Sequence, residues 1–405
     1  MNIVILTHYL PYPLTSGGAQ AQYNMIDQLR SRHNITLVFN EGSGNTIQAM
    51  KQLQALWPEV KIVAYRYYRQ LSCWRFVRDK IIRGLLVKFA PKSRMLKIDR
   101  ILKPYGQWFS DDQIRFTHKI IKDAKADLVQ VEFFQCIGWS HYLPSDIKKV
   151  FVHHEVNFIR NERFLKDFNL SAKEKEAMAR MKQYEIDSLN KYDHIITLTD
   201  TDCKILQNHN VTTPISVSSA AVSSKPLPYC EWKGKIIFIG SYAHIPNREG
   251  MDWFVNQVAP ALTDDTQVDI IGALWPPEYN DRFGHVQLHS LGFVDDLTKV
   301  AYGNIMIVPL LTGSGMRMKI LEAMAMSMPV ITTTVGVEGI PLVDGESCLI
   351  ADTPEAFAQA IKKLSEDAVL RSKLGKAANQ VFMDAYSPQQ LAKVREKIYY
   401  QIVGK

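Results

Sequence analysis

The stretch that decides the fold is IVPLLTGSGMRMKILEAMAMSMPVITTTVGVEGI, which spans residues 307–340. It begins in an apolar run that ends at Pro309 and is typical of a buried strand. The polar loop Thr312–Gly315 follows, and the strong helix formers of residues 316–326 predict a helix. Residues 330–334 are rich in β-branched side chains and favour another strand. This order predicts a parallel α/β unit that places a helix N-terminus at the edge of a sheet.

The same unit carries the residue types of an anion-binding site. Gly313 and Gly315 let the backbone approach a phosphate, and the free N–H groups of a helix N-terminus point toward such a ligand. Arg317 and Lys319 add positive charge. Glu322 lies in an apolar run, where a carboxylate requires a partner. A surface turn before an amphipathic helix is the alternative, but the apolar setting of Glu322 favours a binding site.

The segment GSGMRMKILEAMAMSMPVITT resembles the donor-site signature of the family 4 (group 1) retaining glycosyltransferases. The resemblance is to the branch whose glycine-rich loop precedes Arg-x-Lys-x-Leu-Glu-Ala. It implies an α/β fold of the GT-B type, with two doubly wound Rossmann-like domains facing each other across a cleft. We therefore expect an acceptor-binding domain at 1–215, a linker at 216–233 and a nucleotide-sugar-binding domain at 234–387. A last helix at 388–405 is expected to cross back to the first domain.

Length and composition agree with two ordinary soluble domains. A chain of 405 residues, 46% hydrophobic and 22% charged, corresponds to about two or three domains. No apolar run reaches the roughly 18–20 residues that span a bilayer, and residues 1–6 lack the basic region of a signal peptide. The five cysteines are scattered and show no Cys-x-x-Cys spacing. This pattern predicts a reduced, cytoplasmic protein without structural zinc.

Two features of the N-terminal half are expected to face the cleft. The strand-like residues 2–7 lead through a loop to Gly17 and Gly18, as in the opening of a βαβ unit. The resemblance places this glycine pair near the donor diphosphate or the acceptor, and a turn needed only for packing is the alternative. The resemblance also implies that His154 lies beside the reacting sugar, where an imidazole can donate or accept a hydrogen bond. The alternatives are that His153 takes this role or that the histidine only caps a strand.

In the second domain the chain departs from the broad family at two positions. Ser241 and Ser314 stand where many members carry an arginine and a second glutamate, whereas Gly240, Ser241 and Asn247 match the narrower branch. The resemblance implies that Glu322 binds the nucleotide ribose and that the backbone near Val294 meets the base. The donor-binding residues that we expect are Gly17, Gly18, Gly240, Ser241, Asn247, Val294, Gly313, Ser314 and Gly315. The catalytic residues that we expect are His154, Arg317, Lys319 and Glu322.

Residues 66–103 form a strongly basic segment. They include twelve Lys or Arg and two Asp, in a chain whose net charge is +7. Aromatic and aliphatic residues lie among the cations, a pattern typical of contact with an anionic membrane surface. A solvated amphipathic helix is the main alternative. Nucleic-acid binding ranks last because no helix-turn-helix, zinc-finger or RNA-binding signature accompanies the charge. We expect peripheral contact with the inner face of the cytoplasmic membrane.

Together the residues and the resemblance predict a retaining, metal-independent glycosyltransferase. It is expected to move a sugar from a nucleoside-diphosphate sugar to a glycan or lipid-linked acceptor in polysaccharide synthesis, without a further cofactor. Arg317, Lys319 and helix N-termini are expected to stabilise the departing diphosphate. One alternative is a nucleotide-sugar 2-epimerase, in which residues 66–103 have no purpose. The other is a non-catalytic GT-B binding partner, which Ser241 and Ser314 would suit.

Overall fold

Two sheets form the framework of the molecule. The structure is a computed structural model and describes residues 1–14, 16–41, 46–65, 109–166, 168–222, 225–262, 265–313 and 315–405. The seven strands of the first sheet lie in the order β3 (Lys61–Tyr65), β2 (Asn34–Asn40), β1 (Asn2–Thr7), β4 (Leu128–Glu132), β5 (Lys148–His153), β6 (His194–Thr197) and β7 (Ile215–Val217). Each of these strands runs parallel to its neighbours.

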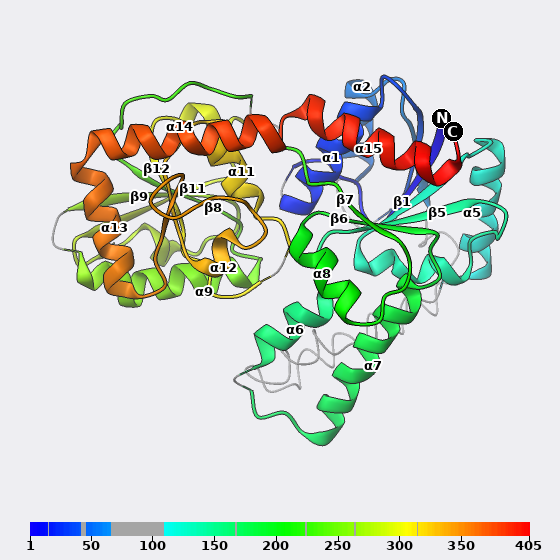
Figure 1. Ribbon diagram of the computed structural model, residues 1–405, viewed down its shortest axis with the longest axis horizontal. Coiled ribbons are helices and arrows are strands. Elements are labelled where there is room, and N and C mark those ends of the chain that lie inside the picture. The colour runs from blue at the N-terminus through cyan, green and yellow to red at the C-terminus, as the bar shows by residue number, and fades with distance from the viewer. Residues whose placement is uncertain are drawn as a thin grey trace.

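The second sheet also has seven strands and a similar topology. They lie in the order β10 (Arg282–Phe283), β11 (Val286–Gly292), β9 (Thr266–Ile271), β8 (Ile236–Ile239), β12 (Ile305–Val308), β13 (Val330–Thr332) and β14 (Leu349–Ile350). The short edge strand β10 pairs antiparallel with β11, and the other described pairings are parallel. Figure 1 shows the two sheets in separate lobes.

Helices connect the strands and cover the sheets. Those of the first domain are α1 (Gly17–Leu29), α2 (Thr46–Leu56), α5 (Asp111–Asp123), the 3-10 helix η2 (Phe134–His141), α6 (Asn157–Leu165), α7 (Ala172–Leu189) and α8 (Asp200–Asn208). Those of the second are α9 (Ile245–Trp253), η3 (Phe254–Val258), η4 (Ala259–Ala261), η5 (Pro277–Asn280), α10 (Leu297–Val300), α11 (Met318–Ala325), α12 (Thr334–Val337), α13 (Pro354–Glu366) and α14 (Ala368–Ala385). The last helix is α15 (Pro388–Val403).

Local sequence accounts for many of these elements. Central strands are continuous apolar runs, as expected where helices cover both faces of a parallel sheet, and all of β12 is buried. The side chains of Ser110, Ser171 and Thr199 accept hydrogen bonds from backbone N–H groups and cap α5, α7 and α8. Thr353 caps α13 in the same way, because its hydroxyl accepts from the Ala356 N–H at 3.2 Å.

The helix that follows the glycine loop is shorter than predicted. Helix formers from residue 316 to residue 326 predicted its length, whereas α11 begins at Met318 and ends at Ala325. Arg317 is the N-cap residue, with φ −85° and ψ 81°. Its Nη1 donates back to the Gly315 carbonyl at 2.6 Å. Arg317 therefore lies at the junction of loop and helix, outside the first helical turn.

Helix α15 joins the second domain to the first. In Figure 1, α14 runs along the second domain and α15 continues across the first, so that the two termini lie close together. Arg395 of α15 donates from Nε to the Ser218 hydroxyl at 2.9 Å. The fully buried Tyr399 donates its hydroxyl to Gln130 Oε1 in β4. These contacts tie the end of the chain to the interior of the first domain.

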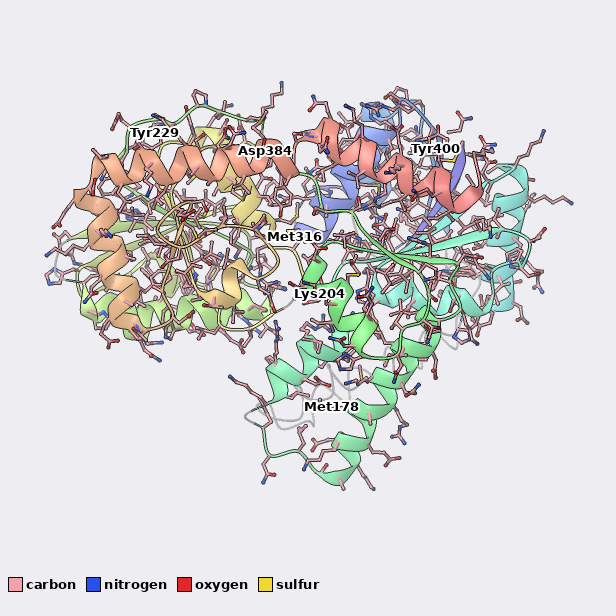
Figure 2. All side chains as sticks on the ribbon, viewed as in Figure 1. Met178, Lys204, Tyr229, Met316, Asp384 and Tyr400 are labelled. Atoms are coloured by element: carbon pink, nitrogen blue, oxygen red, sulfur yellow. The ribbon has the colours of Figure 1, made fainter. Side chains whose placement is uncertain are left out.

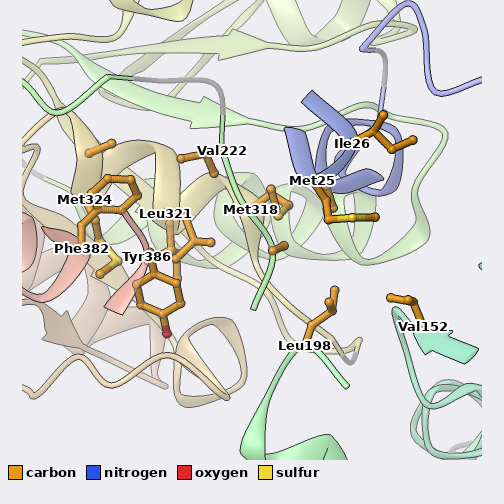
Figure 3. Packing of buried hydrophobic residues seen from close by; sticks show 14 of the residues in the cluster. Met25, Ile26, Val152, Leu198, Val222, Met318, Leu321, Met324, Phe382 and Tyr386 are labelled. Carbon is orange, nitrogen blue, oxygen red and sulfur yellow. The ribbon is translucent and has the colours of Figure 1, made fainter. Parts of the chain in front are cut away.

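One cluster of buried hydrophobic side chains extends through both domains. Figure 3 shows Met25 and Leu198 of the first domain in the same cluster as Met318 and Leu321 of α11. Helix α11, which follows the glycine loop, therefore packs into an apolar interior that both domains share.

Two predictions concern residues that lie outside the described part of the chain. These are the membrane contact of residues 66–103 and the donor contact of Ser314. Both stay predictions. Among the helices that the structure does describe, none is long and apolar enough to cross a membrane.

Candidate functional site

A cavity of about 360 Å³ lies between the two domains. Phe133 and His154 line it directly after the ends of β4 and β5, and Gly240 does so directly after the end of β8. In open parallel sheets, ligands bind at these carboxyl ends, near the point where the strand order reverses. Figure 2 shows Met316, another lining residue, where the two lobes meet. The volume is that of a site for a small-molecule ligand.

The loop beside the cavity requires glycine at two positions. Gly313 has φ +114° and Gly315 has φ +78°, both in the left-handed region that other residues rarely adopt. A Cβ atom on Gly315 would also lie 2.5 Å from the carbonyl oxygen of His154 in the first domain. The glycines therefore let the loop turn sharply and approach the opposite domain.

Lys319 provides a partly buried cation on the second-domain side of the cavity. Its Nζ donates to Asn247 Oδ1 at 2.7 Å and lies 4.2 Å from the centroid of the Phe238 ring. Asn247 is fixed by donating to the Ser241 carbonyl at 2.9 Å. A Cβ atom on Gly240 would collide with this amide. Burial, and then the neighbouring Arg317, lower the pKa of Lys319 to about 7.

Arg317 is a second cation at the same wall, and it is buried. Besides Gly315, its guanidinium donates to the Val335 carbonyl at 3.3 Å. Burial lowers the pKa of Arg317 from its ordinary value, although the nearby carboxylates of Glu155, Glu338 and Asp202 act in the opposite direction. Two positive charges thus lie close together in partly desolvated surroundings. An anionic ligand would stabilise both of them.

On the opposite wall, His154 is held by a buried carboxylate. Its Nε2 lies 2.8 Å from Oε2 of Glu132, the last residue of β4, and its ring stacks on Phe133 with centroids 4.1 Å apart. The other carboxylate oxygen of Glu132 accepts from Gln130 Nε2 at 2.6 Å. Because Nε2 is engaged, Nδ1 is the ring nitrogen that His154 can offer to a ligand.

His153 occupies a different environment from its neighbour. It is 1% exposed, and its Nε2 lies 3.0 Å from Oε1 of Glu185 in α7. The same carboxylate accepts backbone N–H groups of Asn157 and Phe158 at the start of α6. His153 belongs to the interior of the first domain, whereas His154 lines the cavity.

The glycine pair near the N-terminus also borders the cavity. A Cβ atom on Gly17 would lie 3.3 Å from the Met318 side chain, and one on Gly18 would lie 3.0 Å from the Phe133 ring. The first turn of α1 therefore packs against α11 across the gap between the domains.

The structure brings most of the expected site residues together. The cavity is lined by Gly17, Gly18, His154, Gly240, Ser241, Asn247, Val294, Gly313, Arg317 and Lys319. Gly315 and Glu322 are not among the lining residues. Glu322 is 2% exposed within α11, and its contact with a ribose stays a prediction.

Four charged or titratable residues at the site received no role from the sequence. Glu155 and His244 line the cavity, Glu132 supports His154, and Arg163 bonds the glycine loop. Burial lowers the pKa of His244 to about 4, so that its imidazole is neutral at pH 7. One signal was available for Glu132, since a carboxylate at the carboxyl end of a mainly apolar strand indicates a site at that edge.

One Asp-x-Asp spacing, Asp200 to Asp202, occurs at the start of α8. Asp202 is buried and accepts a hydrogen bond from the Thr199 hydroxyl at 2.7 Å, as part of the cap of that helix. Among the residues that the structure describes, no group of three or more His, Cys, Asp or Glu side chains is placed to hold a metal ion.

The two facing parallel sheets and the cavity between them define a GT-B fold. A TarM variant of S. aureus, solved in complex with fondaparinux, α-GlcNAc-glycerol and UDP, is similar with a TM-score of 0.68, 14% identity and coverage of 98% of this chain and 100% of that chain. Sucrose-phosphate synthase of Thermosynechococcus elongatus is similar with a TM-score of 0.69, 14% identity and 99% coverage of both chains. At these low sequence identities, the structural similarity shows that the fold is shared.

Sequence comparisons match a family model to part of the chain and a relative to most of it. The model of the family described as "Glycosyl transferases group 1" matches residues 233–367. A Klebsiella pneumoniae protein described as "Uncharacterized 44.6 kDa protein in cps region" is 21% identical over 390 residues, which cover 90% of this chain and 91% of that protein. The matched domain and the GT-B fold support a group 1 glycosyltransferase. The narrower family 4 branch stays a prediction.

Proposed function

We propose that this protein is a retaining glycosyltransferase. It moves a sugar from a nucleoside-diphosphate sugar to a glycan or lipid-linked acceptor in the synthesis of a cell-surface polysaccharide. The observation that carries the proposal is a pair of cations, the buried Arg317 and the partly buried Lys319, beside a glycine loop at the rim of the cavity. The relative encoded in a cps region supports the polysaccharide context.

A diphosphate is the ligand that suits the second-domain wall. Lys319 has a neutral amide as its acceptor, so a diphosphate would supply a counter-charge at this bond. Arg317 lies at the same wall and adds a second positive charge. The TarM variant was solved with UDP, which makes UDP the first nucleotide to test. In this arrangement the base lies toward Val294 and the sugar faces His154.

Transfer then proceeds on one face of the donor sugar. The acceptor hydroxyl forms a bond to the anomeric carbon as the bond from that carbon to the diphosphate breaks, and the hydroxyl proton passes to the leaving phosphate oxygen. Arg317 and Lys319 stabilise the negative charge that develops on the diphosphate. His154 uses Nδ1 to bond the donor sugar, while Glu132 keeps its ring in place.

A thermal-shift panel with UDP, GDP, ADP and CMP tests the donor site. A ligand that binds the folded state alone at 100 times its dissociation constant adds about 2.7 kcal/mol of stability. We expect UDP to stabilise the wild type and Arg317→Ala or Glu322→Ala to abolish the shift. Arg282→Ala, which removes an exposed ion pair with Asp265 in the same domain, is the control and should leave the shift intact.

The outcome of transfer separates this proposal from its alternatives. Nuclear magnetic resonance of the product should show the anomeric configuration of the donor, and an inverted product would contradict retention. Conversion of the donor sugar without any acceptor would indicate an epimerase. Tight UDP binding with neither transfer nor hydrolysis would indicate a binding partner.

A further inference from the structure

Arg163 of α6 makes a contact between the domains that the proposed chemistry does not use. Its Nη1 and Nη2 donate to the two carboxylate oxygens of Glu338 at 2.6 and 2.8 Å, in a bidentate ion pair. The same Nη1 donates to the carbonyl oxygen of Gly313 at 2.7 Å. One guanidinium of the first domain therefore binds both a side chain of the second domain and the backbone of the glycine loop.

The ion pair is partly shielded from solvent and stays charged near neutral pH. The Arg163 and Glu338 side chains are 33% and 27% exposed. The hydrogen bond to Glu338 raises the pKa of Arg163. Burial alone would raise the pKa of Glu338, but the hydrogen bond and charge of Arg163 outweigh it and lower that pKa. Both groups thus keep the charges that the contact needs.

The domains approach each other closely on either side of this pair. Gly339 has φ +81°, and a Cβ atom there would lie 2.8 Å from the Thr199 side chain of the first domain. Likewise, a Cβ atom on Gly315 would lie 2.5 Å from the carbonyl oxygen of His154. Arg163 therefore spans a closed seam, and moving the domains apart would break its bond to Gly313.

Two arginines hold the two glycine carbonyls of the loop. Arg317, from the second domain, binds the Gly315 carbonyl, and Arg163, from the first, binds the Gly313 carbonyl. Arg317 lines the cavity and can touch a donor, whereas Arg163 does not line it. Any effect of Arg163 on a bound donor must therefore pass through Gly313 and the loop.

We propose that Arg163 is a positioning residue that gives the phosphate-binding loop its shape when the two domains close. Donor affinity then depends on a residue of the acceptor-binding domain that never touches the donor. The proposal deepens the proposed function and rests on it, since the loop is taken to bind a donor diphosphate.

The test compares Arg163→Ala, Glu338→Ala and the double variant with the wild type. Calorimetry gives the UDP affinity, and hydrogen exchange without ligand reports on residues 309–321. Lys182→Ala is the matched control. Lys182 of α7 forms an ion pair at 3.2 Å with Glu162, which lies next to Arg163 in α6, and this pair lies within the first domain. Melting temperatures of all variants separate loop effects from loss of the fold.

We expect Arg163→Ala to weaken UDP binding about tenfold, which is the usual effect of losing a hydrogen bond donated by a charged group such as a guanidinium. Hydrogen exchange in the loop should become faster. Glu338→Ala should have a smaller effect because Arg163 keeps its hydrogen bond to the Gly313 carbonyl. The double variant should behave like Arg163→Ala. Unchanged affinity and loop exchange in Arg163→Ala, whatever its melting temperature, would overturn the proposal. If the wild type binds no nucleotide, the proposed function fails, and loop exchange alone still decides whether Arg163 positions the loop.

Discussion

Lys319 links the charge of the site to pH at the scale of a single residue. Its pKa is lowered from 10.5 to about 7, so the side chain is mostly neutral above pH 8 when the cavity is empty. A diphosphate beside Nζ favours the charged form and raises that pKa. We therefore expect UDP binding at pH 8 to be accompanied by uptake of close to one proton, about 0.9 if the pKa of Lys319 in the complex lies well above 8. UDP affinity should fall as the pH rises through 7.

Calorimetry in buffers of different ionisation enthalpy measures this uptake. Lys319→Met should remove it and weaken binding about tenfold or more. The variant also corrects for protons that belong to UDP itself. Equal proton uptake by the variant and the wild type would assign the proton to another group.

Glu132 is expected to act on catalysis through His154. Its two carboxylate oxygens accept hydrogen bonds from Gln130 and His154. A glutamine in its place would turn an NH₂ group toward one of these two donors. Since Glu132 keeps the His154 ring in place to bond the donor sugar, we expect Glu132→Gln to lower kcat about tenfold, as for a lost hydrogen bond, and to leave UDP affinity within about twofold.

Glu185→Gln provides the matched comparison, because it alters the buried carboxylate that holds His153 away from the cavity. It should lower the melting temperature without a matching loss of kcat per folded molecule. If both variants lose kcat to the same extent, the role assigned to Glu132 is only structural.

At the scale of the element, the glycine loop is set by backbone geometry and by the domain that faces it. A side chain in the left-handed region costs roughly 1–2 kcal/mol, and at Gly315 it also meets the His154 carbonyl. Gly345 has a similar φ of +72° but open space around it. We expect Gly315→Ala to destabilise the protein more than Gly345→Ala and to weaken UDP binding.

Urea unfolding and UDP titration of both variants measure the difference. Equal losses of stability would mean that the backbone conformation alone accounts for the effect. Unchanged UDP binding by Gly315→Ala would separate the loop from the donor site.

At the scale of the whole molecule, α15 and the shared hydrophobic cluster hold the domains as one unit. Tyr399→Phe removes the buried hydroxyl that bonds Gln130, and we expect it to lower the free energy of unfolding by about 1 kcal/mol. The neighbouring Tyr400, labelled on α15 in Figure 2, is 40% exposed, so Tyr400→Phe should have little effect. Equal effects of the two changes in chemical unfolding would rule out the buried contact as the cause.

The sequence by itself determined the parts of the site that are local. The strand before Pro309, the glycine loop, Arg317 and Lys319 all lie within residues 305–319, so spacing alone predicted two cations beside a turn at a sheet edge. The family resemblance indicated His154, and the structure places His154 rather than His153 at the cavity.

Only the tertiary structure decided the contacts that join distant segments. Arg163 meets Gly313 and Glu338 across 150 and 175 residues, and His154 meets Glu132 from the neighbouring strand. The pKa of Lys319 likewise follows from burial, which depends on how the two domains pack. Local patterns set which groups the chain carries, but charge state and cross-domain geometry arise from desolvation and long-range contacts that no short stretch encodes.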